Sequence, residues 1–417
     1  MIQSIKKSVL SFLSSSSFTN LLIRGINLLL KFVFQIVIVK AIAIEHFGLY
    51  SYYRNVINIT VFIMGFEIHQ YVLRRIAANQ DKGIIASQYI LYLKMYFLFI
   101  PFYYYFLYKI TDANTGLSLL LLGILIFEHF SGEQVKTLVA LKMSIRSNVQ
   151  FTIRNGLIPL LALGIIYISF PLVTYELLFK FYLLFLILFA IYATYHNGIV
   201  STIISEYKNV AIIEFIRDAV PVSSRYFLIS LMFNLAAVID TFIMKYYGYI
   251  DDIALISFYR NIANMPIMLV YASVISVYLP DLVTQRDLNV RNKLIKKIYL
   301  YNMAIYIASV LIIVSAISPL LEIVQKELLK NNLSILAIML ISNAIYIISM
   351  VPYSVMYSEG RDRTILISAS IYLSILFLMD IILIAQHKAF GAAYATLIST
   401  SIYCLYMIYA NKKSVHD

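Results

Sequence analysis

The sequence predicts an all-α integral membrane protein with about twelve transmembrane helices in two parallel six-helix lobes. Composition is the first observation behind this prediction. Of 417 residues, 61% are hydrophobic and 13% are charged, whereas soluble domains carry about 25% charged residues. The mean hydropathy is +0.84. A chain this apolar, with no long polar stretch, is solvated mainly by lipid.

The second observation is a regular series of apolar runs, each long enough for the roughly 20 residues that one crossing needs. The twelve runs begin near Thr19, Gly48, Ile84, Thr115, Phe151, Glu176, Pro221, Ile253, Leu294, Leu333, Thr364 and Gly391. They predict lobes at 19–200 and 220–410, an inter-lobe linker at 201–219, an interfacial segment at 1–18 and a tail at 411–417. Nineteen Lys and Arg side chains fall on the side of the N-terminus and six on the other. This asymmetry predicts that both termini and the linker are cytoplasmic.

The third observation is an internal repeat. Residues 51–59 (SYYRNVINI) and 257–265 (SFYRNIANM) are identical at five of nine positions, and Arg24 has a counterpart in Arg225. The copies lie six spans apart, so both halves insert in the same orientation, which is a transporter architecture. Chance similarity in a biased composition is the alternative. The shared residues are polar and arginine is rare in spans, which favours a true repeat.

Polar and cationic side chains recur inside the predicted spans. In the first span they are spaced by three or four residues, which places them on one helical face. A charge inside a span costs about 2.5–3.5 kcal/mol and usually faces a cavity or a partner. We therefore expect a central cationic cavity that binds a pyrophosphate through arginine and a glycan through amides. The candidate substrate-binding residues are Arg24, Asn27, Lys31, Arg54, Asn58, Arg154, Arg260 and Asn264. The alternative is that some of these cations reach the interface or pair with Glu67, Glu128 or Glu133.

Acidic residues inside spans are fewer. Asp240, Asp380 and Thr396 belong to the seventh, eleventh and twelfth spans and are candidates for a cation or proton site. The alternative is that both aspartates lie near the membrane surface and are hydrated. Glu128, beside His129, is expected either to relay a proton or to pair with an arginine.

The sequence offers no catalytic site. The single cysteine, Cys404, excludes a disulfide framework and a multi-cysteine metal site, and the six histidines lack metal-ligand spacing. A membrane transporter is expected rather than an enzyme.

Several short motifs resemble those of one transporter family. They are Arg24-Gly25, Glu45 to Tyr50, Gly65-Phe66, Arg74 to Ala77, Tyr357 to Arg361 and Gly391 to Thr396. Together they resemble a Wzx-type O-antigen flippase of the polysaccharide transporter group in the MOP exporter superfamily, over essentially the whole chain. This superfamily also contains lipid II flippases and MATE multidrug antiporters.

The resemblance implies a function in lipopolysaccharide O-antigen biosynthesis. Such proteins move undecaprenyl-pyrophosphate-linked oligosaccharides from the inner to the outer leaflet of the bacterial inner membrane by alternating access. It implies a lipid-linked oligosaccharide and membrane lipid as partners, with an O-antigen polymerase and a chain-length regulator beside them, and no nucleic acid. The coupling ion is expected to be Na⁺ or H⁺, and no other cofactor is expected.

The resemblance also assigns residues. Lipid II flippases use arginines of helices 1, 2 and 8, which Arg24, Arg54 and Arg260 match here. Some relatives hold Na⁺ between helices 7, 11 and 12, which points to Asp240, Asp380 and Thr396, although Leu376 provides no ligand one turn before Asp380.

Two other functions fit the sequence less well. A multidrug antiporter would need a cavity acidic enough for cationic drugs, whereas basic residues dominate here. A polytopic O-antigen polymerase would be expected to have long outer loops carrying catalytic groups, and the outer loops predicted here are short.

Overall fold

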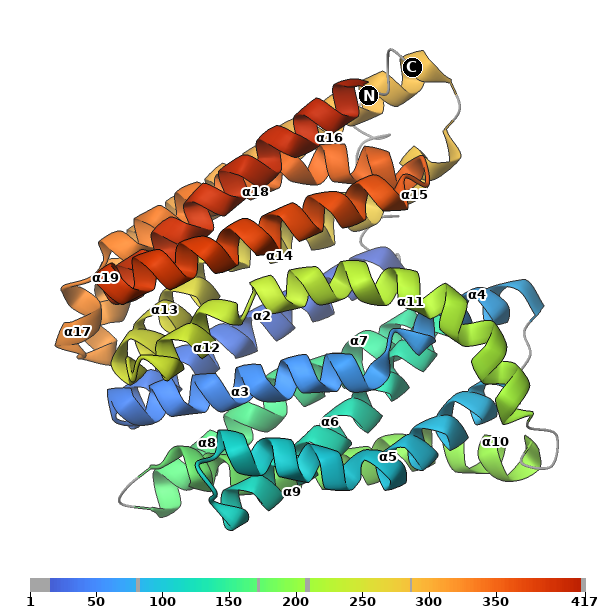
Figure 1. Cartoon of the computed structure of the whole chain (residues 1–417), viewed down its shortest axis with the longest axis horizontal. Coiled ribbons are helices and arrows are strands. Elements are labelled where there is room, and N and C mark those ends of the chain that lie inside the picture. The colour runs from blue at the N-terminus through green and yellow to red at the C-terminus, as the bar shows by residue number, and fades with distance from the viewer. Residues whose placement is uncertain (1–15, 80–82, 171–172, 207–210, 286, 414–417) are drawn as a thin grey trace, which may run out of the picture. The chain divides into compact units, whose positions relative to one another are not determined.

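The computed structural model describes residues 16–79, 83–170, 173–206, 211–285 and 287–413, and every element in these ranges is helical (Figure 1). The chain forms two compact units. The first comprises Met1–Phe34 and Val56–Phe227, and the second Gln35–Asn55 and Leu228–Asp417. Three long helices therefore contribute to both units. The predicted two-lobe division with its boundary at 201–219 stays a prediction.

The helices of the first half of the chain are α2 (Ser16–Ala41), α3 (Ile44–Gly65), α4 (Ile68–Asn79), α5 (Gly83–Ile110), α6 (Thr115–Ala140), α7 (Ser144–Thr152), the π-helix η1 (Ile153–Leu157), α8 (Ile158–Ser169), α9 (Tyr175–His196), α10 (Ile199–Glu206) and α11 (Ile212–Ala236). Those of the second half are α12 (Ile239–Tyr246), α13 (Ile250–Ala263), α14 (Met265–Val270), η3 (Tyr271–Ile275), α15 (Ser276–Thr284), α16 (Leu288–Val324), α17 (Glu327–Lys330), α18 (Ser334–Ser358) and α19 (Asp362–Lys413). Most of the predicted interfacial segment and residues 414–417 of the predicted tail lie outside the described residues.

The long helices of the described ranges fit the twelve crossings that the sequence predicts. Ten helices in the described ranges are long and apolar enough to span a membrane, and the two helices of the pair α3–α4, bent by 52°, pass the same test when taken together. The 52 residues of α19 would extend about 78 Å as one straight helix, more than twice the hydrocarbon thickness. Its backbone breaks at Lys388 (φ 52°, ψ −125°), so α19 supplies two crossings.

Several helices begin before the apolar run that predicts them. The fifth span starts at Ser144 rather than Phe151, the seventh at Ile212 rather than Pro221, and the ninth at Leu288 rather than Leu294. Asp287 explains the last case, because its side chain accepts hydrogen bonds from the backbone N–H groups of Asn289 (2.8 Å) and Val290 (3.2 Å). This N-cap lets the helix start in a polar stretch.

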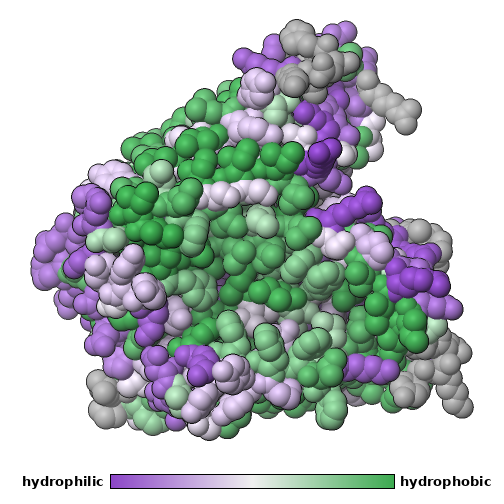
Figure 2. All heavy atoms as spheres, viewed as in Figure 1, coloured by the Kyte–Doolittle hydropathy of each residue, from purple (hydrophilic) through white to green (hydrophobic). Residues whose placement is uncertain are grey.

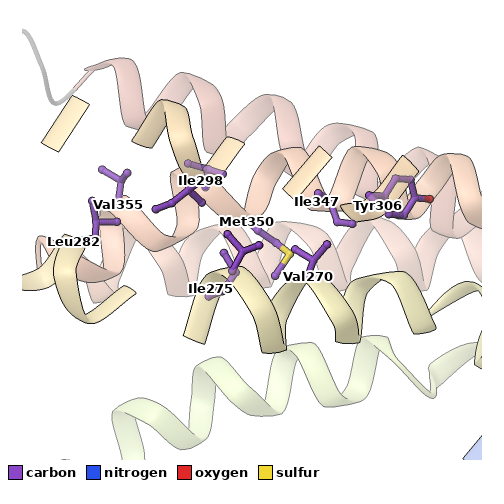
Figure 3. Close-up of a cluster of buried hydrophobic side chains, with 10 residues drawn as sticks. Val270, Ile275, Leu282, Ile298, Tyr306, Ile347, Met350 and Val355 are labelled. Atoms are coloured by element: carbon purple, nitrogen blue, oxygen red, sulfur yellow. The ribbon is translucent and has the colours of Figure 1, made fainter. Parts of the chain in front are cut away.

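Each unit has its own apolar core. In the first unit, α6 and α9 pack together over side chains such as Leu121, Leu125 and Leu186, all fully buried. In the second, α14, η3, α15, α16 and α18 enclose a cluster around Met350 (Figure 3). The cluster consists of Val270, Val274, Ile275, Leu282, Ile298, Tyr306, Ile347, Met350, Val351 and Val355.

The outer surface is apolar as well. Phe97 and Ile168 are each 86% exposed, and hydrophobic side chains cover much of the face shown in Figure 2, with hydrophilic ones gathered at its margins. A soluble protein rarely exposes large apolar patches. The chain is therefore a multi-pass membrane protein.

The two copies of the repeat occupy α3 and the α13–α14 junction, and the tyrosines at their third positions, Tyr53 and Tyr259, are both buried. The first copy lies within one uninterrupted helix, whereas the second crosses a helix end at Asn264, with Pro266 at the start of α14. Gly48 of α3 packs against the first residue of α13. A Cβ at position 48 would lie 2.2 Å from the Ile250 carbonyl oxygen.

Candidate functional site

The polar face of α2 is bound to α7 by a chain of amides in the first unit. The Arg24 Nε–H donates to Asn148 Oδ1 (3.4 Å), and Asn148 Nδ2 donates to Asn20 Oδ1 (2.8 Å). Asn20 in turn donates to the Ser144 hydroxyl (3.0 Å). Asn148 has no place in the sequence prediction, because α7 begins before the apolar run that marks the fifth span.

The same helix carries Asn27 and Lys31 one and two turns further on. Asn27 is buried, and its Oδ1 would lie 3.3 Å from a Cβ at Gly156, so the glycine leaves room for the amide. The Lys31 ammonium is 5.4 Å from the centre of the Phe151 ring, a cation–π distance. Asn58, on α3, is exposed.

Arg154 lies in the π-helical turn η1 and contacts Glu128 of α6. Its Nε is 3.8 Å from Glu128 Oε2, and its Nη1–H donates to the Glu128 backbone oxygen (3.3 Å). The Tyr182 hydroxyl donates to Glu128 Oε1. Of the two roles that the sequence left open for Glu128, this geometry is that of pairing with an arginine. π-Helical turns often occur at functional sites.

A second carboxylate of α6 organises a buried polar cluster that the sequence analysis did not identify. Glu133 is 1% exposed and accepts hydrogen bonds from Gln88 Nε2, the Tyr92 hydroxyl and Lys136 Nζ, each at 2.8 Å. Three donors satisfy a carboxylate that would otherwise be costly to bury. The available signal was Gln88 and Glu133, two polar residues deep inside apolar spans.

In the second unit, the structure joins two residues to which the sequence gave separate roles. Arg260 of α13 forms an ion pair with Asp240 of α12, with Nη1 3.1 Å from Oδ1 and Nη2 against Oδ2. The same guanidinium donates to the Ala237 carbonyl oxygen (3.0 Å). Asp240 also accepts hydrogen bonds from the backbone N–H (2.7 Å) and hydroxyl (3.3 Å) of Thr241. Both oxygens of this carboxylate are thus engaged, Oδ1 by three donors and Oδ2 by one.

Asp240 and Asp380 are not hydrated, because the two residues are 2% and 0% exposed. Asp380 lies on α19, and neither of its carboxyl oxygens has a hydrogen-bond partner among the described residues. Thr396, one crossing later, donates its hydroxyl to the Ala392 backbone oxygen (2.9 Å) of its own helix. The described residues contain no group of three or more His, Cys, Asp or Glu side chains that could hold a metal ion.

The remaining candidates in the second unit are placed around α13. Arg54 is half-buried on α3. Asn264 caps the end of α13 and accepts a hydrogen bond from Asn343 Nδ2 (3.3 Å). Asn261, the neighbour of Arg260, donates to Gln35 Oε1 (3.1 Å). These amides are therefore engaged with other helices of the unit.

Comparison with known proteins identifies the fold. The chain is similar to the lipid II flippase MurJ in an inward closed conformation, with a TM-score of 0.75 and 14% identity over 94% of this chain and 87% of that one. It is also similar to a multidrug resistance MATE family transporter of the MOP superfamily in an inward-facing conformation (TM-score 0.67, 13% identity, 96% and 98% covered). A MATE transporter of Vibrio cholerae gives a TM-score of 0.60 at 12% identity, with 96% and 95% covered.

No protein-family model matches the sequence, and no curated protein matches it. The fold is the one shared by these MurJ and MATE transporters.

Proposed function

We propose that this chain is a flippase that moves undecaprenyl-pyrophosphate-linked O-antigen repeat units from the cytoplasmic to the periplasmic leaflet of a bacterial inner membrane. Alternating access would carry the head group across, driven by an ion gradient or the membrane potential. The O-antigen polymerase and the chain-length regulator would then act on its product. Fold similarity to a lipid II flippase supports a lipid-linked cargo, since lipid II is one.

The observation that carries the proposal is the cationic face of α2. Arg24, Asn27 and Lys31 lie within two turns of one helix, and Arg24 and Asn27 are held by contacts to the fifth span. Guanidinium groups bind phosphate oxygens through paired N–H donors, and amides bind sugar hydroxyls. The net charge of +12 favours an anionic cargo over a cationic one.

Complementation tests this function. A strain that lacks its own O-unit flippase and carries the matching O-antigen genes would express the wild-type chain or Arg24→Ala, Arg54→Ala and Arg260→Ala. Surface polysaccharide restored by the wild type and lost in well-expressed variants is the expected result. Restoration by all three variants would reject the proposed site, and no restoration by the wild type would reject the substrate.

A MATE-like antiporter is the second candidate, because the MATE transporters match the fold over 96% of this chain. The buried carboxylates Asp240 and Asp380 favour it, since an acidic site suits a cation. Raised tolerance to cationic drugs, lost in Asp380→Asn and unaccompanied by surface polysaccharide, would favour the antiporter over the flippase.

A further inference from the structure

The site that the resemblance assigns to Na⁺ does not fit that ion. Hard cations are held by several oxygen ligands at once. Here both oxygens of Asp240 are bound to Arg260, whose guanidinium already supplies the positive charge that Na⁺ would bring. Leu376, one turn before Asp380, has no oxygen in its side chain, and the Thr396 hydroxyl points to the backbone of its own helix. One carboxyl group, that of Asp380, is left for a cation to bind.

The charges in this cluster do not balance. Two carboxyl groups, Asp240 and Asp380, share one guanidinium, and both are buried. An ionised carboxylate that is buried without a donor is very costly, and such a group is commonly neutralised instead. Asp240 has four donor contacts, whereas Asp380 has no hydrogen-bond partner among the described residues. The charge imbalance therefore falls on Asp380.

Among the described residues, Arg260 is the cation that acts on Asp380. Helices α12, α13 and α18 pack against α19. Helix α12 contributes Asp240, and its Lys245 lies further along the helix, 5.7 Å from the centre of the Tyr52 ring. Helix α13 contributes Arg260 and has Asp251 and Asp252 in its first turn, whereas α18 has no Asp, Glu, Lys, Arg or His in its sequence. Asp380 also acts on Tyr372, two turns earlier on α19. Next to α19, the C-terminal part of α11 contributes apolar side chains such as Ala236.

We propose that Asp380 is the proton-binding residue of this transporter, that Arg260 is the resident counter-cation of Asp240, and that the coupling ion is H⁺ rather than Na⁺. The proposal rests on the transport function proposed above for its role as coupling ion. One proton on Asp380 brings the cluster of Asp240, Asp380 and Arg260 to zero net charge. Removal of that proton leaves a surplus negative charge, for which Arg260, whose side chain is 20% exposed, is the nearest compensating group. Protonation of Asp380 is thus tied to the pairing of Arg260, which is the kind of two-state element a coupled transporter needs.

Infrared difference spectroscopy, in which the spectrum of each variant is subtracted from that of the wild type, tests whether Asp380 is protonated. The full-length protein is measured in lipid vesicles at neutral pH, with no cargo present. The wild type should show the carbonyl band of a protonated carboxylic acid, unchanged when Na⁺ replaces K⁺. Asp380→Asn should lose the band. Asp240→Asn should also lose it, because the released Arg260 can then pair with Asp380. Asp251→Asn, an exposed aspartate at the start of α13, is the matched control and should keep it.

Binding of radioactive ²²Na⁺ to the same vesicles tests whether the site holds Na⁺ instead of a proton. Saturable Na⁺ binding that disappears in Asp380→Asn would overturn the proposal, as would a wild-type spectrum without the acid band. If Asp380→Asn does not fold, the proposal is still tested by two spectra. The wild-type acid band should be the same in Na⁺ and K⁺, and it should be absent in Asp240→Asn. Neither measurement contains a lipid cargo. A protein that keeps the acid band but fails to complement would therefore refute the flippase function and leave the proton site standing.

Discussion

The two copies of the repeated segment share a sequence pattern but differ in the charged partners of their arginines. Arg54 and Arg260 occupy equivalent positions, 206 residues apart. Arg260 is paired with the buried Asp240, 20 residues before it, whereas the residue 20 positions before Arg54 is Phe34. The two segments thus share a helical arginine, whereas the aspartate that pairs with Arg260 has no acidic counterpart at the same distance before Arg54. On the proposals above, ion coupling is assigned to the second half of the chain and cargo binding to the cationic face of α2.

The largest effect is expected where an arginine balances buried acids. Arg260→Gln leaves Asp240 and Asp380 without their cation, and breaking a buried ion pair costs about 3–5 kcal/mol. Thermal unfolding of the detergent-purified protein should show this loss, with most of it recovered in the double variant Arg260→Gln/Asp240→Asn. Arg54→Gln is the matched control and should cost less. If Arg260→Gln and Arg54→Gln destabilise the protein equally, the two arginines do not differ in their electrostatic role.

The next effect concerns transport rather than stability. Arg24→Ala removes a guanidinium whose one hydrogen bond within the described part of the chain, to Asn148, is long (3.4 Å), so folding should be preserved. Loss of a charge-assisted hydrogen bond to a phosphate costs about 1.5–3 kcal/mol, which is roughly a 10- to 100-fold loss of cargo affinity. The loss of cargo affinity is measured by the flipping of a pyrophosphate-linked lipid in vesicles at a series of lipid concentrations. Arg225→Ala, which changes an exposed arginine of the seventh span, should leave flipping unchanged; equal losses would mean that the halves share the cargo site.

A packing difference between the copies sharpens the comparison. Gly48→Ala places a Cβ 2.2 Å from the Ile250 carbonyl oxygen, and such overpacking typically costs about 1–3 kcal/mol. The equivalent position in the second copy is Ala254, where a side chain is accommodated. Ala254→Gly should cost about 1 kcal/mol, the usual penalty of glycine in a helix. Comparison of unfolding midpoints of the two variants tests this, and a neutral Gly48→Ala would contradict the close approach of the two helices.

The smallest effect is expected at Thr396. Its hydroxyl bonds to its own helix, so Thr396→Val should change stability by less than about 1 kcal/mol. If the coupling ion is a proton on Asp380, transport should also be unchanged and insensitive to Na⁺. A strong, Na⁺-dependent loss of transport in this variant would show that Thr396 is an ion ligand.

The sequence was a good guide to the fold and a partial one to the site. Hydropathy is a local property, so the twelve crossings, including the last two within α19, follow from composition and run length. The pairing of Arg260 with Asp240 joins two helices, and the isolation of Asp380 depends on helices from three parts of the chain. Neither could be read from spacing along one helix. The amide chain through Asn148 was missed for a simpler reason, since α7 starts in a polar stretch that hydropathy does not assign to a span.

The break at Lys388 has a consequence for how the chain enters the membrane. Only a bend separates the last two crossings, and Ala389 N–H is held there by the Asp252 carboxylate (3.2 Å). The bend carries only the short exposed polar stretch 386–388, so we expect the two crossings to insert together as a helical hairpin. Asp362 and Lys413 then lie on the same side of the bilayer. A reporter enzyme fused after the last helix would therefore read out the side of the turn at residues 359–361.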